Sequence, residues 1–305
     1  GPLLDGSIKP VGIPDADGNY VMAPYSARGN DEIKKFYQTG TILQNNLNIS
    51  AGGADGYVNL NLGNVRRDFI LEGDELNRNT VVLTAGKKIN KFTVGGTFTF
   101  TNQRTKQANV NAATSRSDYT LLTTLLQAAS NVPIEEFKNR GLYGWNGYYQ
   151  NPYWARENNR LEETKNFINL GMNAGYEINK NIEIVYNGSV QMRNTNQVSY
   201  SNQAISPADA DGGFDSPSQF YQSTLGSTFY YGDLMANFNY DLSDALKLKF
   251  NVGQNVQYNY SKRISQGGTN LEIPGLYNIA NVLNPANPST LDNRTIETRS
   301  TATFA

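Results

Sequence analysis

The sequence predicts an all-β protein, one part of a large antiparallel transmembrane β-barrel with long loops at one end. Apolar and small polar residues alternate along many segments, with the period of two that is typical of a strand. Short and long connections alternate between these segments, and the second face of the segments is polar but mostly uncharged. The stretch 92–101 shows the pattern most simply, because one face carries only apolar residues and glycine: Phe92, Val94, Gly96, Phe98 and Phe100.

The composition of the 305-residue chain excludes several classes of function. Lys and Arg total 26 and Asp and Glu total 27, so the net charge of -1 provides no basic field for nucleic acid. The charged fraction of 17% is low against roughly 25% in soluble domains. Cys and His are both absent, which removes disulfides, thiolate nucleophiles and the commonest general base and metal ligand. No apolar run approaches the roughly 18 residues of a membrane helix.

The first half of the chain is expected to form a loop region, four strands and a long loop. Residues 1–38 are rich in Gly, Pro and Asp and carry little periodicity, which favours a loop region. Alternation then predicts strands at about 41–51, around 58–62, at about 77–87 and at 92–101. Residues 104–164 interrupt the alternation and are predicted to be a long loop. Within it, helical spacing over 118–129 behind Asp118 predicts a short helix, and a further turn is expected near Pro133.

The second half returns to strand periodicity. Apolar faces recur over 168–176, 182–192, 234–240 and 246–260, and a last strand is expected to begin near Ile296. Long loops are predicted at 199–227 and 263–294. Residues 39–305 therefore form about nine strands with their loops.

Short and long connections alternate along this series of strands. Short turns fall near 52–56, 87–91, 179–181 and 242–245, and long connections fall near 66–76 and at the three long loops. In an up-and-down sheet, all short turns then lie at one end, as in outer-membrane barrels with short periplasmic turns and longer extracellular loops. The apolar face is expected to contact lipid, and the Asn, Thr, Gly and Ser face is expected to line the lumen. A soluble β-sandwich or β-helix stays open as an alternative, because soluble sheets also alternate.

The chain resembles the SusC/RagA family of TonB-dependent outer-membrane transporters, and the resemblance follows most of the chain in order. The segments that carry it are Gly1-Pro2-Leu3-Leu4-Asp5-Gly6, Phe36-Tyr37-Gln38-Thr39-Gly40, Asn45-Asn46-Leu47-Asn48-Ile49-Ser50-Ala51-Gly52-Gly53, Arg78-Asn79 followed by Val94-Gly95-Gly96, and Asn151-Pro152-Tyr153-Trp154.

The resemblance implies a 22-stranded barrel, of which this chain would be the middle segment. It implies that residues 1–38 belong to an extracellular loop region, with a plug domain and a TonB box that are not in this chain. A SusD-like surface lipoprotein, TonB and membrane lipids would be partners, with an oligosaccharide or peptide as substrate. The location implied is the outer membrane of a Gram-negative bacterium of the Bacteroidetes type. No cofactor is expected.

Two groups of residues are candidate sites. An aromatic cluster in the longest loop could contact substrate or the lipoprotein lid, because aromatic rings offer a large contact area; alternatively, it packs a small core within the loop. Three carboxylates in the loop 199–227 could hold calcium, or could form a solvated turn. The aromatic cluster consists of Tyr143, Trp145, Tyr148, Tyr149, Tyr153 and Trp154, and the carboxylates are Asp209, Asp211 and Asp215.

These features are compatible with three functions. The sequence favours active import of oligomeric nutrients, with no bond chemistry in the chain. A surface glycan-binding protein or adhesin is the alternative. A hydrolase that uses paired carboxylates such as Glu135/Glu136 or Glu162/Glu163 is the third hypothesis, but residues adjacent in sequence do not establish a facing acid pair.

Overall fold

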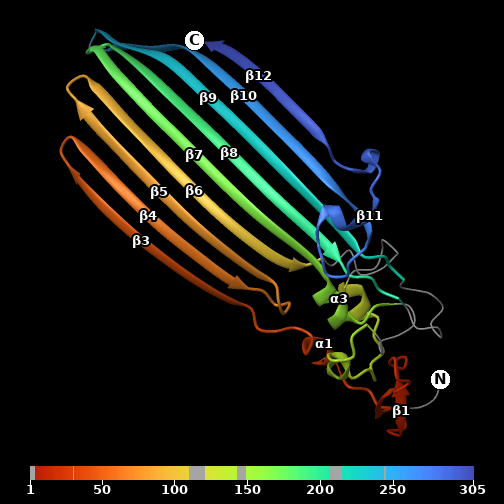
Figure 1. Cartoon of the computed structure of the whole chain (residues 1–305). Helices are drawn as coiled ribbons and strands as arrows, with labels where there is room; N and C mark the ends of the chain where they lie inside the picture. The colour runs from red at the N-terminus through yellow and green to blue at the C-terminus, as the bar shows by residue number, and fades with distance from the viewer. Residues whose placement is uncertain (1–3, 30, 110–120, 143–148, 206–214, 244) are drawn as a thin grey trace.

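The structure, a computed structural model, describes residues 4–29, 31–109, 121–142, 149–205, 215–243 and 245–305. A ten-stranded antiparallel sheet dominates it (Figure 1). Eight strands are neighbours in chain order, and the last two share the outer edge of β10. The strands are β3 (Thr41–Gly53), β4 (Gly56–Asp68), β5 (Glu75–Ile89), β6 (Phe92–Ala108), β7 (Asn159–Asn179), β8 (Ile182–Ser201), β9 (Gln219–Ser243), β10 (Leu246–Leu271), β11 (Val282–Pro285) and β12 (Arg294–Phe304).

The predicted alternation of connections is confirmed. The tight turns after β3, β5, β7 and β9 lie at one end of the sheet, and the longer connections lie at the other (Figure 1). The strands run further than the alternation of apolar residues indicates. Residues 109–158 and 202–218 connect β6 to β7 and β8 to β9, instead of 104–164 and 199–227. Residues 272–293, which include β11, connect β10 to β12, instead of 263–294. The backbone ladder continues through polar pairs such as Thr105 opposite Glu163, where hydropathy no longer marks the strand.

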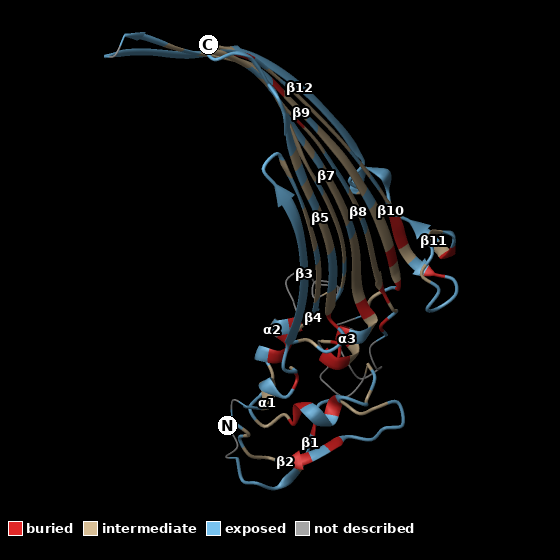
Figure 2. Cartoon of the chain, turned by 90° about the vertical axis from the view of Figure 1, so that its left-hand side faces the viewer, coloured by how far each residue is buried: buried red, intermediate tan, exposed pale blue. Residues whose placement is uncertain are grey.

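One face of the sheet is apolar and lies open. Leu47 and Leu170 are each 53% exposed, and Phe92 stands beside Tyr176 near the tight turns, both exposed. In the part of the chain that the structure describes, no second sheet or helical layer covers either face (Figure 2). A soluble β-sandwich buries one face of each sheet, so this arrangement contradicts the sandwich alternative.

The opposite face is polar, as predicted. Strand after strand contributes Asn, Thr, Ser and Gln, for example Asn61, Thr99, Asn169 and Gln191. The alternation of neighbouring residues between the two faces accounts for this separation. The sheet is also curved (Figure 2).

Not all asparagines of the strands lie on the polar face. Six of them stand in one register row on the apolar face, directly beyond its apolar residues on the side of the long connections. The prediction that the Asn residues line the lumen is therefore wrong for this row. Four of the six amides form hydrogen bonds across strands, Asn64 to Asn79 and Asn102 to Asn166, each at 2.7 Å, which helps the row to border an apolar surface. The row consists of Asn45, Asn64, Asn79, Asn102, Asn166 and Asn194.

The hydrophobic core lies outside the sheet, among the long connections. The N-terminal hairpin and four short helical segments pack together there, at the lower end in Figure 2. Phe36, Leu125, Ile134 and Phe137 are fully buried in this loop core. The elements are β1 (Ile8–Val11), β2 (Val21–Pro24), α1 (Asp31–Lys34), α2 (Leu121–Leu126), the 3-10 turn η1 (Ile134–Phe137) and α3 (Pro152–Asn158); two further 3-10 turns, η2 (Ile279–Asn281) and η3 (Pro288–Thr290), follow β10.

The helix predicted over 118–129 is present as α2 and ends at Leu126, three residues earlier than predicted, while Asp118 lies outside the described residues. The turn expected near Pro133 is confirmed as η1. None of the helices in the described ranges is long and apolar enough to cross a membrane.

Candidate functional site

Six cationic residues line the polar face at the end of the long connections. Four of them share one register row across β5, β7, β10 and β12, and the other two lie two residues away along their strands. We call this set the basic belt. It consists of Arg67, Arg78, Lys165, Arg193, Arg263 and Arg294.

The basic belt is only partly neutralised. Lys165 Nζ lies 2.7 Å from Glu163, and Arg263 and Arg294 lie 3.0 Å and 3.4 Å from the single carboxylate of Asp292. Arg67 and Arg193 instead lie over the rings of Phe69 and Phe167, at 4.6 Å and 5.7 Å from the ring centroids. Six cations thus face two carboxylates, which gives this end of the polar face a positive potential that attracts anionic groups.

A polar pocket of about 340 Å³ lies beside the belt. Its lining includes hydroxyl and amide side chains from β8, β9 and β10, together with Arg263. The Nε of Arg263 is shielded from solvent and has no hydrogen-bond partner within the described ranges. An unpaired donor beside hydroxyls and amides suits a ligand with several acceptor oxygens. Lining residues include Leu161, Gln197, Ser199, Tyr221, Arg263 and Asp292.

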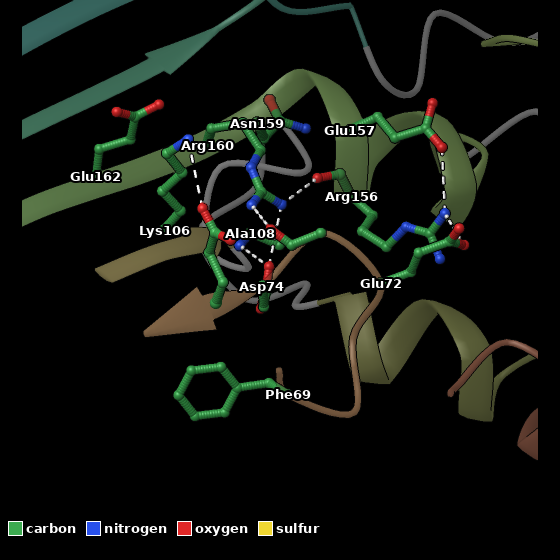
Figure 3. A network of polar contacts seen from close by, with 12 residues as sticks. Phe69, Glu72, Asp74, Lys106, Ala108, Arg156, Glu157, Asn159, Arg160 and Glu162 are labelled. Carbon is green, nitrogen blue, oxygen red and sulfur yellow. Dashed lines mark hydrogen bonds and ion pairs between the residues drawn. The ribbon is translucent and has the colours of Figure 1, made fainter. Parts of the chain in front are cut away.

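An ionic network at the ends of the strands fixes the loop core to the sheet (Figure 3). Asp74, which ends the β4–β5 connection, is buried and accepts hydrogen bonds from the N–H of Ala108 (2.7 Å) and from Arg160 Nη1 (3.0 Å). The same guanidinium donates to the carbonyls of Gly73 and Arg156. Burial raises the pKa of Asp74, while the bonds from Ala108 and Arg160 act to lower it. The network therefore joins three strand ends that are far apart in sequence.

Helix α3 supplies the second part of the network. The Asn151 side chain caps its first turn by accepting the N–H of Tyr153 at 3.1 Å, with Pro152 in the first turn. Arg156 is 2% exposed, and its guanidinium lies 3.0 Å from Glu72. A hydrogen bond from Lys138, together with the charge of Arg156, lowers the pKa of Glu72.

The structure separates the members of the predicted aromatic cluster. Tyr153 is buried against Phe36, with the ring centroids 4.9 Å apart, so it packs the loop core. Tyr149 is half-buried and donates to Gln127 Oε1 at 2.6 Å, and Trp154 is half-buried in α3. Tyr143, Trp145 and Tyr148 lie outside the described residues.

The structure describes the paired glutamates, but two of the three carboxylates of the predicted calcium site lie outside the described residues. Glu162 and Glu163 follow each other in β7 and lie on opposite faces, and Glu135 in η1 pairs with Lys35. Asp209 and Asp211 lie outside the described ranges, whereas Asp215 lies inside them. Within those ranges, no group of three or more acidic side chains could hold a metal ion.

Sequence reasoning missed the basic belt and the row of asparagines. Their residues are single polar positions on strands that are far apart in the chain, and only the register between strands aligns them. Alternation indicates which residues of one strand share a face, but not which residues of distant strands share a row. The sequence did not indicate which residues of two strands joined by a long connection stand opposite each other.

No family model and no curated protein sequence matches this chain. Solved structures do match it. The RagAB peptide importer in the "closed-closed" state has a TM-score of 0.65 at 13% identity over 98% of this chain, and its "open-open" state has a TM-score of 0.61 at 14% identity over 91%. A further structure of the RagAB peptide transporter has a TM-score of 0.63 at 12% identity over 90%.

This chain spans only 30% to 31% of the length of those three chains. The predicted fold class is confirmed: the chain has the fold of one part of a large antiparallel β-barrel, similar to about a third of the barrel chains in the RagAB structures.

Proposed function

We propose that the chain forms part of the wall and the external loops of an outer-membrane importer of oligomeric nutrients. The observation that carries the proposal is the sheet with one open apolar face and one polar face. Water would not stabilise so large an exposed apolar surface, whereas lipid does. The apolar stretch of β6 runs from Phe92 to Phe100, and its length falls within the roughly 9–11 residues of a tilted transmembrane strand.

Import, rather than passive anchoring, is supported by the polar face and by the likeness to a peptide importer. In this proposal the polar face lines the lumen, and the long connections, including residues 1–38, lie outside the cell. A SusD-like lipoprotein would cover the mouth, and TonB would act on a plug domain encoded elsewhere in the protein, as the family resemblance implies. The substrate would be a peptide or a glycan, and the chain would break no bond in it.

The basic belt favours negatively charged substrates. The positive potential of the belt, at the outer mouth of the barrel, raises the local concentration of anionic oligomers. This increase is smaller at high salt, because salt screens the charges. Carboxylate-bearing peptides and acidic glycans both carry the required charge. The polar pocket beside Arg263 would bind their acceptor oxygens.

Membrane insertion is the first test of the proposal. The complete protein that contains this chain is expected to fractionate with the outer membrane, to require detergent for extraction and to migrate faster on gels when unheated. Cells that express it are expected to take up labelled oligopeptides or oligosaccharides. A protein that is soluble without detergent would contradict the proposal, and surface binding without uptake would favour the adhesin alternative.

Charge removal in the basic belt tests the substrate preference. The double variant R78Q/K165Q is expected to lower the uptake rate of an acidic oligopeptide several-fold at low salt, and to leave a neutral peptide of equal length nearly unaffected. The matched control K88Q/K249Q removes two charges from the same face at the end with the tight turns. Equal losses for both peptides would show that the belt does not select by charge.

A further inference from the structure

Two arginines stand on the apolar face, just beyond the row of asparagines. Arg66 on β4 and Arg104 on β6 occupy the same register row, and Asn77 of β5 lies between them. Strands are spaced about 4.8 Å apart, so the two Cα positions are about 10 Å from each other. Both side chains are exposed.

Neither arginine has an acidic partner in the described part of the chain. The next row holds three carboxylates, and each has another partner. Asp68 accepts the Thr41 hydroxyl at 3.0 Å, Glu75 pairs with Lys106 at 3.4 Å, and Glu162 accepts the Tyr200 hydroxyl at 3.4 Å. An exposed guanidinium without a carboxylate offers all its N–H donors to an external anion. Phosphate matches that fork of donors well.

Neutral amides lie between the two arginines and in the row directly below them. Asn64 Nδ2 donates to Asn79 Oδ1 at 2.7 Å and to Asn77 Oδ1 at 3.3 Å, and Asn102 Nδ2 donates to Asn166 Oδ1 at 2.7 Å. These contacts hold the amides in place across neighbouring strands. A ligand that binds here therefore meets polar groups whose positions are already fixed.

The row below the asparagines is apolar. Leu62, Val81 and Phe100 stand side by side on β4, β5 and β6. Along this face the order is therefore apolar side chains, neutral amides and then cations. A phosphorylated membrane lipid presents the same order: acyl chains, then ester, amide or sugar oxygens, and then phosphate.

From this match we infer that Arg66 and Arg104, with Asn77 and Asn79, form a binding site for the phosphate-bearing headgroup of a membrane lipid. The lipid belongs to the leaflet at the end of the long connections, and its acyl chains lie against Leu62, Val81 and Phe100. This inference rests on the proposed function, because it requires the apolar face to contact lipid. The continuity of the cations with the apolar surface favours a lipid over a free anion or an acidic protein.

Native mass spectrometry of the complete barrel protein in neutral detergent tests the site. Diphosphorylated lipid A is the probe, and the same lipid without phosphates is its control. The double variant R66Q/R104Q is expected to bind the phosphorylated probe at least about tenfold more weakly, because it loses two charge-assisted contacts. R66K/R104K is expected to retain part of the affinity. The matched control R67Q/R78Q removes two arginine charges from the opposite face and is expected to leave lipid affinity unchanged.

The unmodified protein is expected to prefer the phosphorylated over the phosphate-free lipid by a similar factor, so the test does not depend on a variant. Equal affinity for the two lipids would overturn the inference, and so would full displacement of the probe by millimolar inorganic phosphate. If the unmodified protein prefers the phosphorylated lipid but takes up no oligopeptide or oligosaccharide, the transport proposal is contradicted and the lipid site is supported. A protein that does not enter membranes would overturn both.

Discussion

Replacing Asp74 with alanine is expected to destabilise the attachment of the loop core to the sheet by about 3–5 kcal/mol. The substitution leaves Arg160, whose side chain is 12% exposed, as a buried charge without its carboxylate. It also removes the acceptor for the N–H of Ala108. Hydrogen exchange by mass spectrometry would measure the effect as faster exchange of the amides at the loop ends of β6 and β7.

A neighbouring ion pair provides the control. Glu75 follows Asp74 directly and pairs with Lys106, but both side chains are about half exposed. Because exposed ion pairs contribute less than about 1 kcal/mol, Glu75→Ala is expected to change exchange only slightly. Similar effects for both variants would mean that the burial of the Asp74–Arg160 pair does not hold the loop core.

Replacing Leu125 with alanine is expected to cost about 2–5 kcal/mol in the loop core. Leu125 is 0% exposed and belongs to the same buried cluster as Phe36, Ile134 and Phe137. The shortened side chain leaves a cavity among elements that have few other contacts with the sheet. Limited proteolysis is expected to cut the connection between β6 and β7 at least tenfold faster, while the barrel keeps its resistance to unheated detergent.

The adjacent leucine is a close control, because Leu126 lies on the same helix but is 63% exposed. Leu126→Ala is expected to stay within about 0.5 kcal/mol of the unsubstituted protein. A large effect of Leu126→Ala would show that its exposed surface is covered in the full assembly, for example by the lipoprotein partner proposed above.

The Asp74 and Leu125 variants affect two separate parts of the loop end. The ionic network around Asp74 and Arg160 positions the loop core on the strand ends, and the buried residues around Leu125 keep it folded. The basic belt lies at the same end of the sheet. Uptake assays on both variants would therefore show whether an ordered loop core is required for import or only for contact with the lid.

For the predicted aromatic cluster, the sequence did not show which side chains are buried and which are open to a ligand. The sequence placed Tyr153 among six aromatic residues in a long loop, and both packing and ligand contact were open. The structure buries Tyr153 against Phe36, which lies 117 positions earlier in the chain. That neighbour cannot be identified from local pattern, because no periodicity connects residues across four strands and their connections.

The sequence by itself determined the strands, their two faces and the alternation of tight turns with long connections. These are local properties: a period of two fixes which residues share a face, and turn residues lie between the periodic segments. The tertiary structure alone decided the row of asparagines, the basic belt and the pair of Arg66 with Arg104. Each is a register relation between strands, such as Asn102 opposite Asn166 across the longest connection. Register depends on backbone pairing and loop closure over the whole sheet, which the alternation within one strand does not specify.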